Sequence, residues 1–202
     1  MRVEHLIQNG TFGTSAEGLE IVAEIQAGIA EVVWPPGSTQ FTIRPERHVN
    51  GVTPIKVDFI RHLVSRGWAA EVRLSIGELG AGPLDAVKTL ADGRKFAVEW
   101  ETGNISSTHR AINKMALGML RGELVGGAIV LPTRVMYPYL TDRVGNFAEI
   151  APYFDVWRSW PHVQGLLAVF AVEHDAVSPD AVPIPKGTDG WANFNTQMRD
   201  GA

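Results

Sequence analysis

Three consecutive segments between residues 96 and 131 constrain the fold of this chain more than any other feature. Large apolar side chains alternate with smaller or acidic ones from residue 96 to 101, which is the period of a half-buried strand. Apolar side chains then recur at helical spacing over residues 107–120, with Ser107 as the predicted N-cap. Residues 128–131 are all apolar, as expected of a short buried strand. Strands separated by a helix point to an α/β domain with a mixed sheet.

The rest of the chain fits a single domain of this class. Hydrophobic periodicity predicts helices over residues 16–33 and 54–66 and strands at 41–43 and 166–172. We therefore expect an α/β domain with a mixed β-sheet over residues 1–173. Residues 174–202 are rich in Pro, Asp and Gly, which predicts an irregular C-terminal arm of the same domain, outside its core.

The composition excludes several classes of protein. The chain of 202 residues contains no cysteine, which rules out disulfides, thiolate catalysis and cysteine-ligated zinc. It has no run of about 18 apolar residues and no apolar signal-peptide core after Met1, so we expect no membrane span and a cytoplasmic location. The net charge of −4 argues mildly against a protein that coats DNA nonspecifically.

Positive charge is nevertheless concentrated in two stretches. Residues 40–68 contain five Lys or Arg against two acids, and residues 104–121 contain three Lys or Arg and no acid. Such clusters can face phosphates while the remaining surface stays acidic. They can equally be solvated helix faces, and charge alone leaves both interpretations open.

Three carboxylates form the candidate reactive centre. Glu99 and Glu101 lie two residues apart on the predicted strand, so both side chains leave the same face. Between Asp85 and Glu99 there is enough chain for a strand, a turn at residues 91–94 and an antiparallel return, which would bring Asp85 opposite the glutamates. Oxygen ligands without His or Cys suit Mg²⁺. The alternative is an exposed acidic face on an ordinary hairpin.

A polar run follows the second glutamate. Asn104 and Ser106 have side chains that hydrogen-bond to base edges, and Arg110 can donate two hydrogen bonds to a guanine. The alternative is that these residues only form a turn and a helix cap.

The sequence Glu-Trp-Glu-Thr-Gly-Asn-Ile-Ser-Ser-Thr-His-Arg at residues 99–110, followed by Asn113-Lys114, resembles the core of the BamHI family of type II restriction endonucleases. Other blocks agree in the same order between residues 30 and 190. They are Phe41-Thr42-Ile43, Asn50-Gly51-Val52, Pro54-Ile55-Lys56, Gly82-Pro83-Leu84-Asp85, Tyr139-Leu140-Thr141-Asp142-Arg143-Val144, Asn146-Phe147, Pro152-Tyr153-Phe154 and Ile184-Pro185-Lys186-Gly187-Thr188-Asp189-Gly190. The family belongs to the PD-(D/E)xK nuclease superfamily, which implies a restriction-endonuclease-like core with a central mixed β-sheet flanked by helices on both sides.

The resemblance implies roles for individual residues. The implied catalytic residues are Glu71, Asp85, Glu99 and Glu101, of which Glu71, Asp85 and Glu99 are the metal ligands. The implied DNA contacts are Lys56 near the phosphates, Asn104, Ser106, Arg110, Asp142 and Arg143 in the major groove, and Asp189 and Gly190 in the minor groove. Glu101 is a departure from the wider superfamily, which has lysine at that position.

The resemblance also implies the reaction and the partners. We expect Mg²⁺-dependent hydrolysis of one phosphodiester in each strand of double-stranded DNA, with two ions in each active site, Mn²⁺ as a possible substitute and 5′-phosphate ends as products. The predicted target is the palindrome GGATCC, cut after the first G to leave a 5′-GATC overhang. A palindrome calls for a two-fold homodimer. Met115 and Met119 fit either the dimer surface or the core, and the sequence leaves both open.

Three rival functions remain from the residues themselves. A superfamily nuclease with relaxed or structure-specific cleavage would cut DNA without a sequence preference. A non-catalytic DNA-binding module would be expected to have lost one of Asp85, Glu99 or Glu101, and none is lost. A structural domain that happens to carry acids leaves the polar run after Glu101 unexplained.

Overall fold

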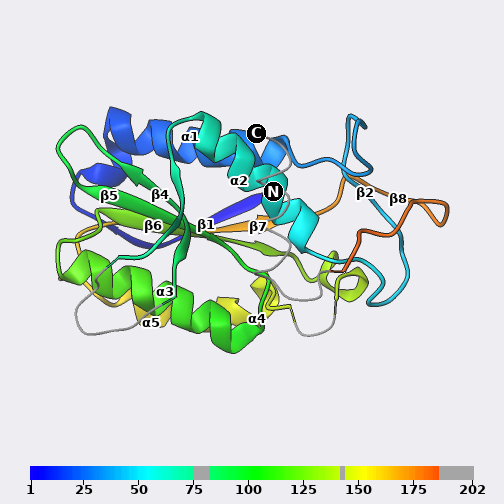
Figure 1. Cartoon of the computed structure of the whole chain (residues 1–202). Coiled ribbons are helices and arrows are strands. Elements are labelled where there is room, and N and C mark those ends of the chain that lie inside the picture. Colours follow the sequence, from blue (N-terminus) through cyan, green and yellow to red (C-terminus); the bar gives the residue numbers. More distant parts are fainter. Residues whose placement is uncertain (75–81, 142–143, 187–202) are drawn as a thin grey trace.

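A computed structural model describes residues 1–74, 82–141 and 144–186 of the chain, and its centre is a six-stranded sheet (Figure 1). The strands are β1 (Arg2–Asn9), β2 (Thr42–Ile43), β3 (Ala69–Val72), β4 (Leu84–Thr89), β5 (Lys95–Trp100), β6 (Gly126–Pro132), β7 (Gly165–Val172) and β8 (Ala176–Val177). The helices are α1 (Ala16–Ala30), α2 (Thr53–Ser65), α3 (Ile105–Leu120), α4 (Phe147–Ile150) and α5 (Phe154–Arg158), with 3₁₀ turns at Phe12–Thr14, Tyr137–Tyr139 and Ala151–Tyr153.

The sheet is mixed, as predicted. Its strand order is β1-β7-β6-β5-β4-β3, with β5, β6 and β7 parallel to one another. The two remaining strands on one side, β4 and β3, are antiparallel to their neighbours, and β1 is antiparallel to β7 on the other side. A separate parallel pair, β2 and β8, lies beside the main body (Figure 1).

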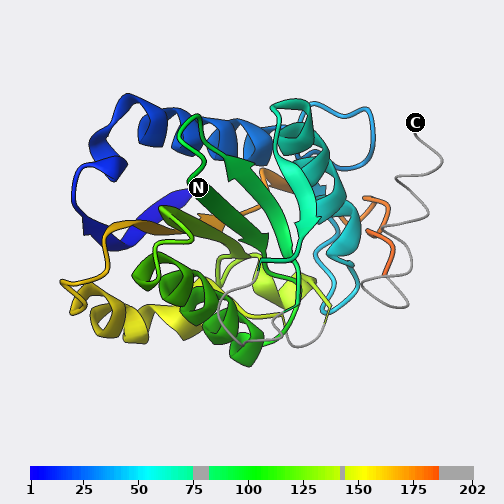
Figure 2. The same cartoon turned by 60° about the vertical axis from the view of Figure 1, so that its left-hand side comes forward.

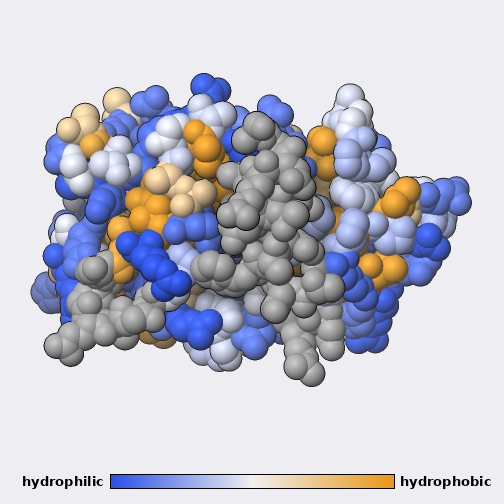
Figure 3. All heavy atoms as spheres, in the orientation of Figure 1, coloured by the Kyte–Doolittle hydropathy of each residue, from blue (hydrophilic) through white to orange (hydrophobic). Residues whose placement is uncertain are grey.

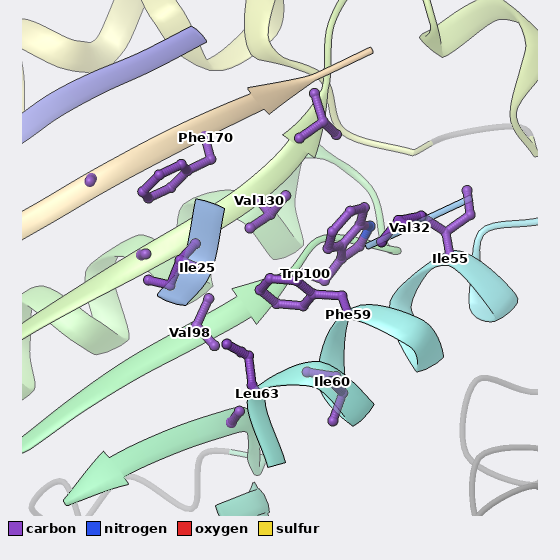
Figure 4. Packing of buried hydrophobic residues seen from close by; sticks show 14 of the residues in the cluster. Ile25, Val32, Ile55, Phe59, Ile60, Leu63, Val98, Trp100, Val130 and Phe170 are labelled. Carbon is purple, nitrogen blue, oxygen red and sulfur yellow. The ribbon is translucent and has the colours of Figure 1, made fainter. Parts of the chain in front are cut away.

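Helices cover both faces of the sheet, which confirms the predicted architecture (Figure 2). One hydrophobic cluster joins α1 and α2 to one face, and a second joins α3 and α5 to the other. The alternation along β5 separates them, because Val98 and Trp100 lie in the first cluster and Ala97 in the second. In Figure 4, Trp100 packs beside Phe59 of α2, with ring centroids 4.9 Å apart. No helix in the described ranges is both long and apolar enough to cross a bilayer.

Two strands of the sheet were not predicted. β1 is an edge strand that mixes charged, polar and apolar residues, and only Leu6 and Ile7 in it are buried. β3 has four residues and no buried one, so it is too short to show a period. Both strands are specified by pairing with a neighbour rather than by their own hydrophobic pattern.

Helix α3 begins earlier than predicted. Asn104, rather than Ser107, is its N-cap, and the Asn104 side-chain oxygen accepts a hydrogen bond from the Ser107 backbone N–H at 3.1 Å. Met115 and Met119 are buried in the cluster under the sheet. Their role is therefore packing within the domain, which settles the alternative that the sequence left open.

The described part of the C-terminal arm packs against the domain. The described segment is mostly irregular, but Ile184 lies in the core, so the prediction that the arm lies outside the core is wrong at this position. Asn50 and Gly51 hold Ile184, since the Ile184 N–H donates to Asn50 Oδ1 at 3.3 Å and the Gly51 N–H donates to the Ile184 carbonyl at 2.8 Å. The division of the chain at residue 173 stays a prediction.

Replacing Gly51 by alanine should destabilise the protein. A Cβ at this position would lie 2.0 Å from the Pro185 carbonyl oxygen, so the backbone of the arm would have to move. Overpacking of this kind typically costs about 1–3 kcal/mol, which we expect to measure as a lower free energy of unfolding in urea. Gly13→Ala is the control, because a Cβ there meets only ordinary contacts. Equal urea midpoints for the two variants would contradict the expectation.

Candidate active site

The register of three neighbouring strands places three acidic residues in a row. In the β3–β4 ladder, Ala70 pairs with Ala86 and Val72 with Leu84, so Glu71 lies opposite Asp85. In the β4–β5 ladder, Ala86 pairs with Val98, so the preceding Asp85 lies opposite the following Glu99. Glu71, Asp85 and Glu99 therefore cross the sheet side by side at the end of β5. We call these three residues the acidic row.

The hairpin between β4 and β5 forms as predicted and orients Asp85. In its turn the Leu90 N–H donates to the Arg94 carbonyl and the Gly93 N–H donates to the Leu90 carbonyl, and Gly93 adopts the left-handed conformation that the turn requires. At the opposite end of the hairpin, Asp85 Oδ2 accepts a hydrogen bond from the Trp100 backbone N–H at 2.8 Å. Because the Trp100 side chain is anchored in the core, this bond holds the carboxylate of Asp85 in a defined place.

Glu71 has an unusual backbone conformation. Its φ is +53°, in the left-handed region that residues other than glycine rarely adopt. Backbone strain of this kind is concentrated at functional sites, where the surrounding structure maintains it. Its function as a metal ligand stays a prediction, but its place in the acidic row agrees with that prediction.

Glu101 lies directly beyond the end of β5 and is buried. Its Oε1 accepts a hydrogen bond from the Gly103 backbone N–H at 2.6 Å. Burial raises the pKa of Glu101, and hydrogen bonds from the Thr108 hydroxyl and from backbone N–H groups partly oppose that rise. A carboxyl with a raised pKa, held by N–H donors, is suited to accept a proton near neutral pH.

Two lysines reach the acidic row from opposite sides of the sheet. Lys56 of α2 places its Nζ 2.5 Å from Asp85 Oδ1 and 3.9 Å from Glu71 Oε1. Lys114 of α3 places its Nζ 2.7 Å from Glu99 Oε1. Ion pairs therefore reach all three carboxylates of the row, and the pair of Glu71 is the longest.

The carboxylates and lysines shift one another's ionisation. Burial and the negative charge of Asp85 raise the pKa of Glu99 to about 8, against the opposing effect of Lys114. Burial also raises the pKa of Glu71. Burial alone would lower the pKa of Lys56, but Asp85 and Glu71 reverse this effect, so the pKa of Lys56 is raised. Several buried acids close together resist ionisation without a cation beside them.

The donor set of the row fits a hard divalent cation. Asp85, Glu99 and Glu71 offer only carboxylate oxygens, which Mg²⁺ and Mn²⁺ prefer. In the described residues, no three acidic or histidine side chains are gathered closely enough to hold an ion as they stand. The acidic row instead forms ion pairs with Lys56 and Lys114, so an ion bound there would compete with at least one ammonium group.

The predicted reading residues of the polar run lie at the start of α3. Asn104, Ser106 and Arg110 are exposed, although the Asn104 oxygen also caps the helix. The alternative of a turn and a cap is thus correct for part of the run and does not exclude contact with DNA. Asp142, Arg143, Asp189 and Gly190 lie outside the described residues. Lys56 contacts Asp85, and its predicted contact with phosphates stays a prediction.

Sequence reasoning did not assign a site function to Lys114 or Thr108. The only signal for Lys114 was its position beside the apolar positions of α3, in a stretch without acids. Thr108 is fully buried, although threonine is mostly exposed in proteins. Neither signal identifies a partner, and the partner of Lys114, Glu99, comes from another segment of the chain.

The surface visible in Figure 3 is mostly hydrophilic where it is coloured, and its apolar residues form small separate groups.

Comparison with known proteins identifies close sequence relatives. The family model for restriction endonuclease BamHI matches residues 1–191. Type II restriction enzyme OkrAI of Oceanobacter kriegii is 52% identical over 193 residues, which cover 95% of this chain and 97% of that protein. Type II restriction enzyme BamHI of Bacillus amyloliquefaciens is 36% identical over 177 residues, covering 84% of this chain and 81% of that protein.

Solved structures show the same fold at low sequence identity. Restriction endonuclease BglII in complex with a DNA 16-mer superposes with a TM-score of 0.63 at 10% identity, covering 92% of this chain and 90% of that one. Free BglII gives a TM-score of 0.52, also at 10% identity, over 87% of this chain and 81% of that chain.

Proposed function

The chain belongs to the BamHI family of restriction endonucleases, which are site-specific DNA endonucleases, and from this premise we propose that it cleaves double-stranded DNA at GGATCC. Cleavage after the first G would leave a 5′-GATC overhang. The observation that carries the proposal is the acidic row of Glu71, Asp85 and Glu99, placed between α2 and the exposed start of α3.

Mg²⁺ is the proposed cofactor, with Mn²⁺ as a substitute. Asp85 and Glu99 would hold it, together with Glu71. When bound, a pair of such ions polarises the scissile phosphate, acidifies a water and stabilises the leaving oxygen. The wider superfamily has a lysine where this chain has Glu101. Without that lysine, positive charge at the phosphate would come mainly from the metal, so we expect no activity without a divalent cation.

The side chains of the protein would then accept the proton of the attacking water and position that water for attack on phosphorus. Glu101 orients the attacking water and accepts its proton, since its raised pKa favours proton uptake. The water oxygen forms a bond to phosphorus as the bond from phosphorus to the 3′-oxygen breaks, which leaves a 5′-phosphate. Lys56, already beside Asp85, supplies positive charge near the phosphate.

Sequence readout is assigned to groups of known hydrogen-bonding preference. Arg110 and Arg143 can donate to N7 and O6 of guanine, Asp142 can accept from N4 of cytosine, and Asn104 can pair with adenine. Ser106 would add a further major-groove contact, and Asp189 and Gly190 would contact the minor groove. A palindromic target then requires a homodimer in which each protomer reads one half-site.

Digestion of a plasmid of known sequence tests the proposal. With Mg²⁺, we expect cleavage only at GGATCC, and sequencing of the ends should give the GATC overhang. EDTA should stop the reaction, and a plasmid without the site should stay intact. Cleavage at random positions or at branched structures would support the rival nuclease function instead. An intact plasmid at every Mg²⁺ concentration would contradict the proposal that the protein cleaves DNA.

Arg110→Ala should weaken binding to the cognate duplex. Losing one bidentate contact to guanine costs about 1–3 kcal/mol and relaxes specificity at that base pair. Gel-shift affinities without Mg²⁺ would measure the loss for GGATCC and for duplexes with one changed pair. Arg94→Ala is the control, because Arg94 lies at the hairpin turn, at the far end of β5 from Glu99. Equal losses on cognate and changed duplexes would reject a base contact by Arg110.

A further inference from the structure

Lys114 is the only lysine of α3, and its ammonium group is inside the candidate metal site. Its Nζ lies 2.7 Å from Glu99 Oε1, and both side chains are largely buried, with 10% and 15% of their surface exposed. The same Nζ lies 3.4 Å from the Gly82 carbonyl oxygen and 3.5 Å from that of Pro83. Lys114 therefore links Glu99 of β5 to the segment just before β4.

We propose that Lys114 is the resident counterion of Glu99, which occupies this ligand until a divalent cation displaces it and so sets the cation affinity of the site. The inference rests on the proposed function, because it takes Glu99 as a metal ligand. Lys114 is a positioning residue in this proposal: it acts on Glu99 and need not touch the DNA.

Charge and burial support this assignment. A buried carboxylate without a partner is unfavourable, and an ammonium group at hydrogen-bond distance compensates the charge. A divalent ion held by Glu99 would lie beside the ammonium group of Lys114, whose like charge repels it, so binding of the ion works against a favourable pair. Lys56 stabilises the neighbouring Asp85 in the same way, but from α2 on the opposite face of the sheet.

The position of Lys114 also joins two functions in one helix. Arg110, a predicted reading residue, lies one helical turn before Lys114, and Asn104 caps the same helix. The helix that presents the reading residues thus also holds one carboxylate of the acidic row, Glu99.

Mn²⁺ binding without DNA tests the proposal. We would measure the affinity of the full chain by electron paramagnetic resonance of the free ion, under argon at pH 8.5, where protons compete least for carboxylates. Lys114→Met should bind Mn²⁺ at least about tenfold more tightly than the wild type, since no ammonium group has to be displaced. Lys114→Arg should stay near the wild-type affinity, because it keeps the positive charge.

Lys88→Met is the matched control. Lys88 forms a comparable part-buried pair with Glu24, at 3.1 Å, away from the acidic row. The loss of that pair should leave Mn²⁺ affinity unchanged, although it also removes a lysine. If Lys114→Met does not fold without metal, Lys114→Gln replaces it in the same measurement.

The possible outcomes separate the inference from the proposed function. Unchanged or weaker Mn²⁺ binding by the Lys114→Met or Lys114→Gln variant would overturn the counterion role, because a purely structural lysine can only weaken the site when it is removed. The wild type would still cleave GGATCC in that case. Absence of both cleavage and Mn²⁺ binding in the wild type would reject the proposed function itself.

Discussion

Asp85→Asn is expected to abolish DNA cleavage while cognate binding persists. The substitution removes a charged ligand from the middle of the acidic row, and its amide nitrogen would face either the Trp100 N–H or the ammonium group of Lys56, both of which are donors. Metal-ion catalysis supplies several kcal/mol of stabilisation, so the cleavage rate should fall on the order of 10³-fold or more.

Single-turnover cleavage of a GGATCC duplex in Mg²⁺ would measure this loss, with gel shifts and circular dichroism to verify binding and folding. Asp92→Asn is the matched control, because Asp92 has the same chemistry and is exposed in the turn at the far end of the hairpin. Its rate should match the wild type. If the Asp85→Asn rate stayed within tenfold of the wild-type rate, Asp85 would not be a catalytic residue.

Glu101→Gln is expected to slow cleavage without a comparable loss of metal binding. General-base catalysis contributes about 10²–10⁴-fold to a rate, so a loss in this range is expected when the base is removed. Glutamine keeps the shape of the side chain and can still accept the hydrogen bond from the Gly103 N–H. The Mn²⁺ affinity should therefore stay near the wild-type value, in contrast to that of Asp85→Asn.

The pH dependence gives an independent measurement of the same group. A base must be ionised to act, and the pKa of Glu101 is raised, so wild-type cleavage should decline at a higher pH than an ordinary glutamate would allow. The part of the decline that Glu101 causes should be missing in Glu101→Gln. Glu123→Gln, at an exposed glutamate beyond α3, is the control for a general loss of charge. A large drop in Mn²⁺ affinity for Glu101→Gln would instead identify Glu101 as a metal ligand.

Periodicity identified the elements that have a strong hydrophobic pattern. The strands β6 and β7 are buried as the sequence predicts, and α3 buries Met115 and Met119 but leaves Leu120 at its end exposed. The alternation in β5 also placed Trp100 in the core and Glu99 on the other face. These patterns are local, because each side chain's direction follows from helix or strand geometry within a few residues.

The sequence-based predictions that were wrong or missing concern segments where local signals compete or are absent. Two capping residues were available at the start of α3, and the structure uses Asn104 instead of Ser107. β1 and β3 have weak patterns, since an edge strand exposes much of its surface. Ile184 lies in an irregular segment without any period, and it is buried because the segment is hydrogen-bonded to Asn50 and Gly51 and its side chain joins the core cluster.

The sequence by itself determined that this protein belongs to a family of site-specific endonucleases, and it identified the candidate reactive groups, namely the carboxylates at 85, 99 and 101 and the polar run after them. Only the tertiary structure decided that Glu71 lies opposite Asp85 and that Lys114 binds Glu99. The physical reason is that residue type and local period are carried by neighbouring residues. Strand register and helix-to-sheet contacts depend instead on the packing of segments far apart in the chain.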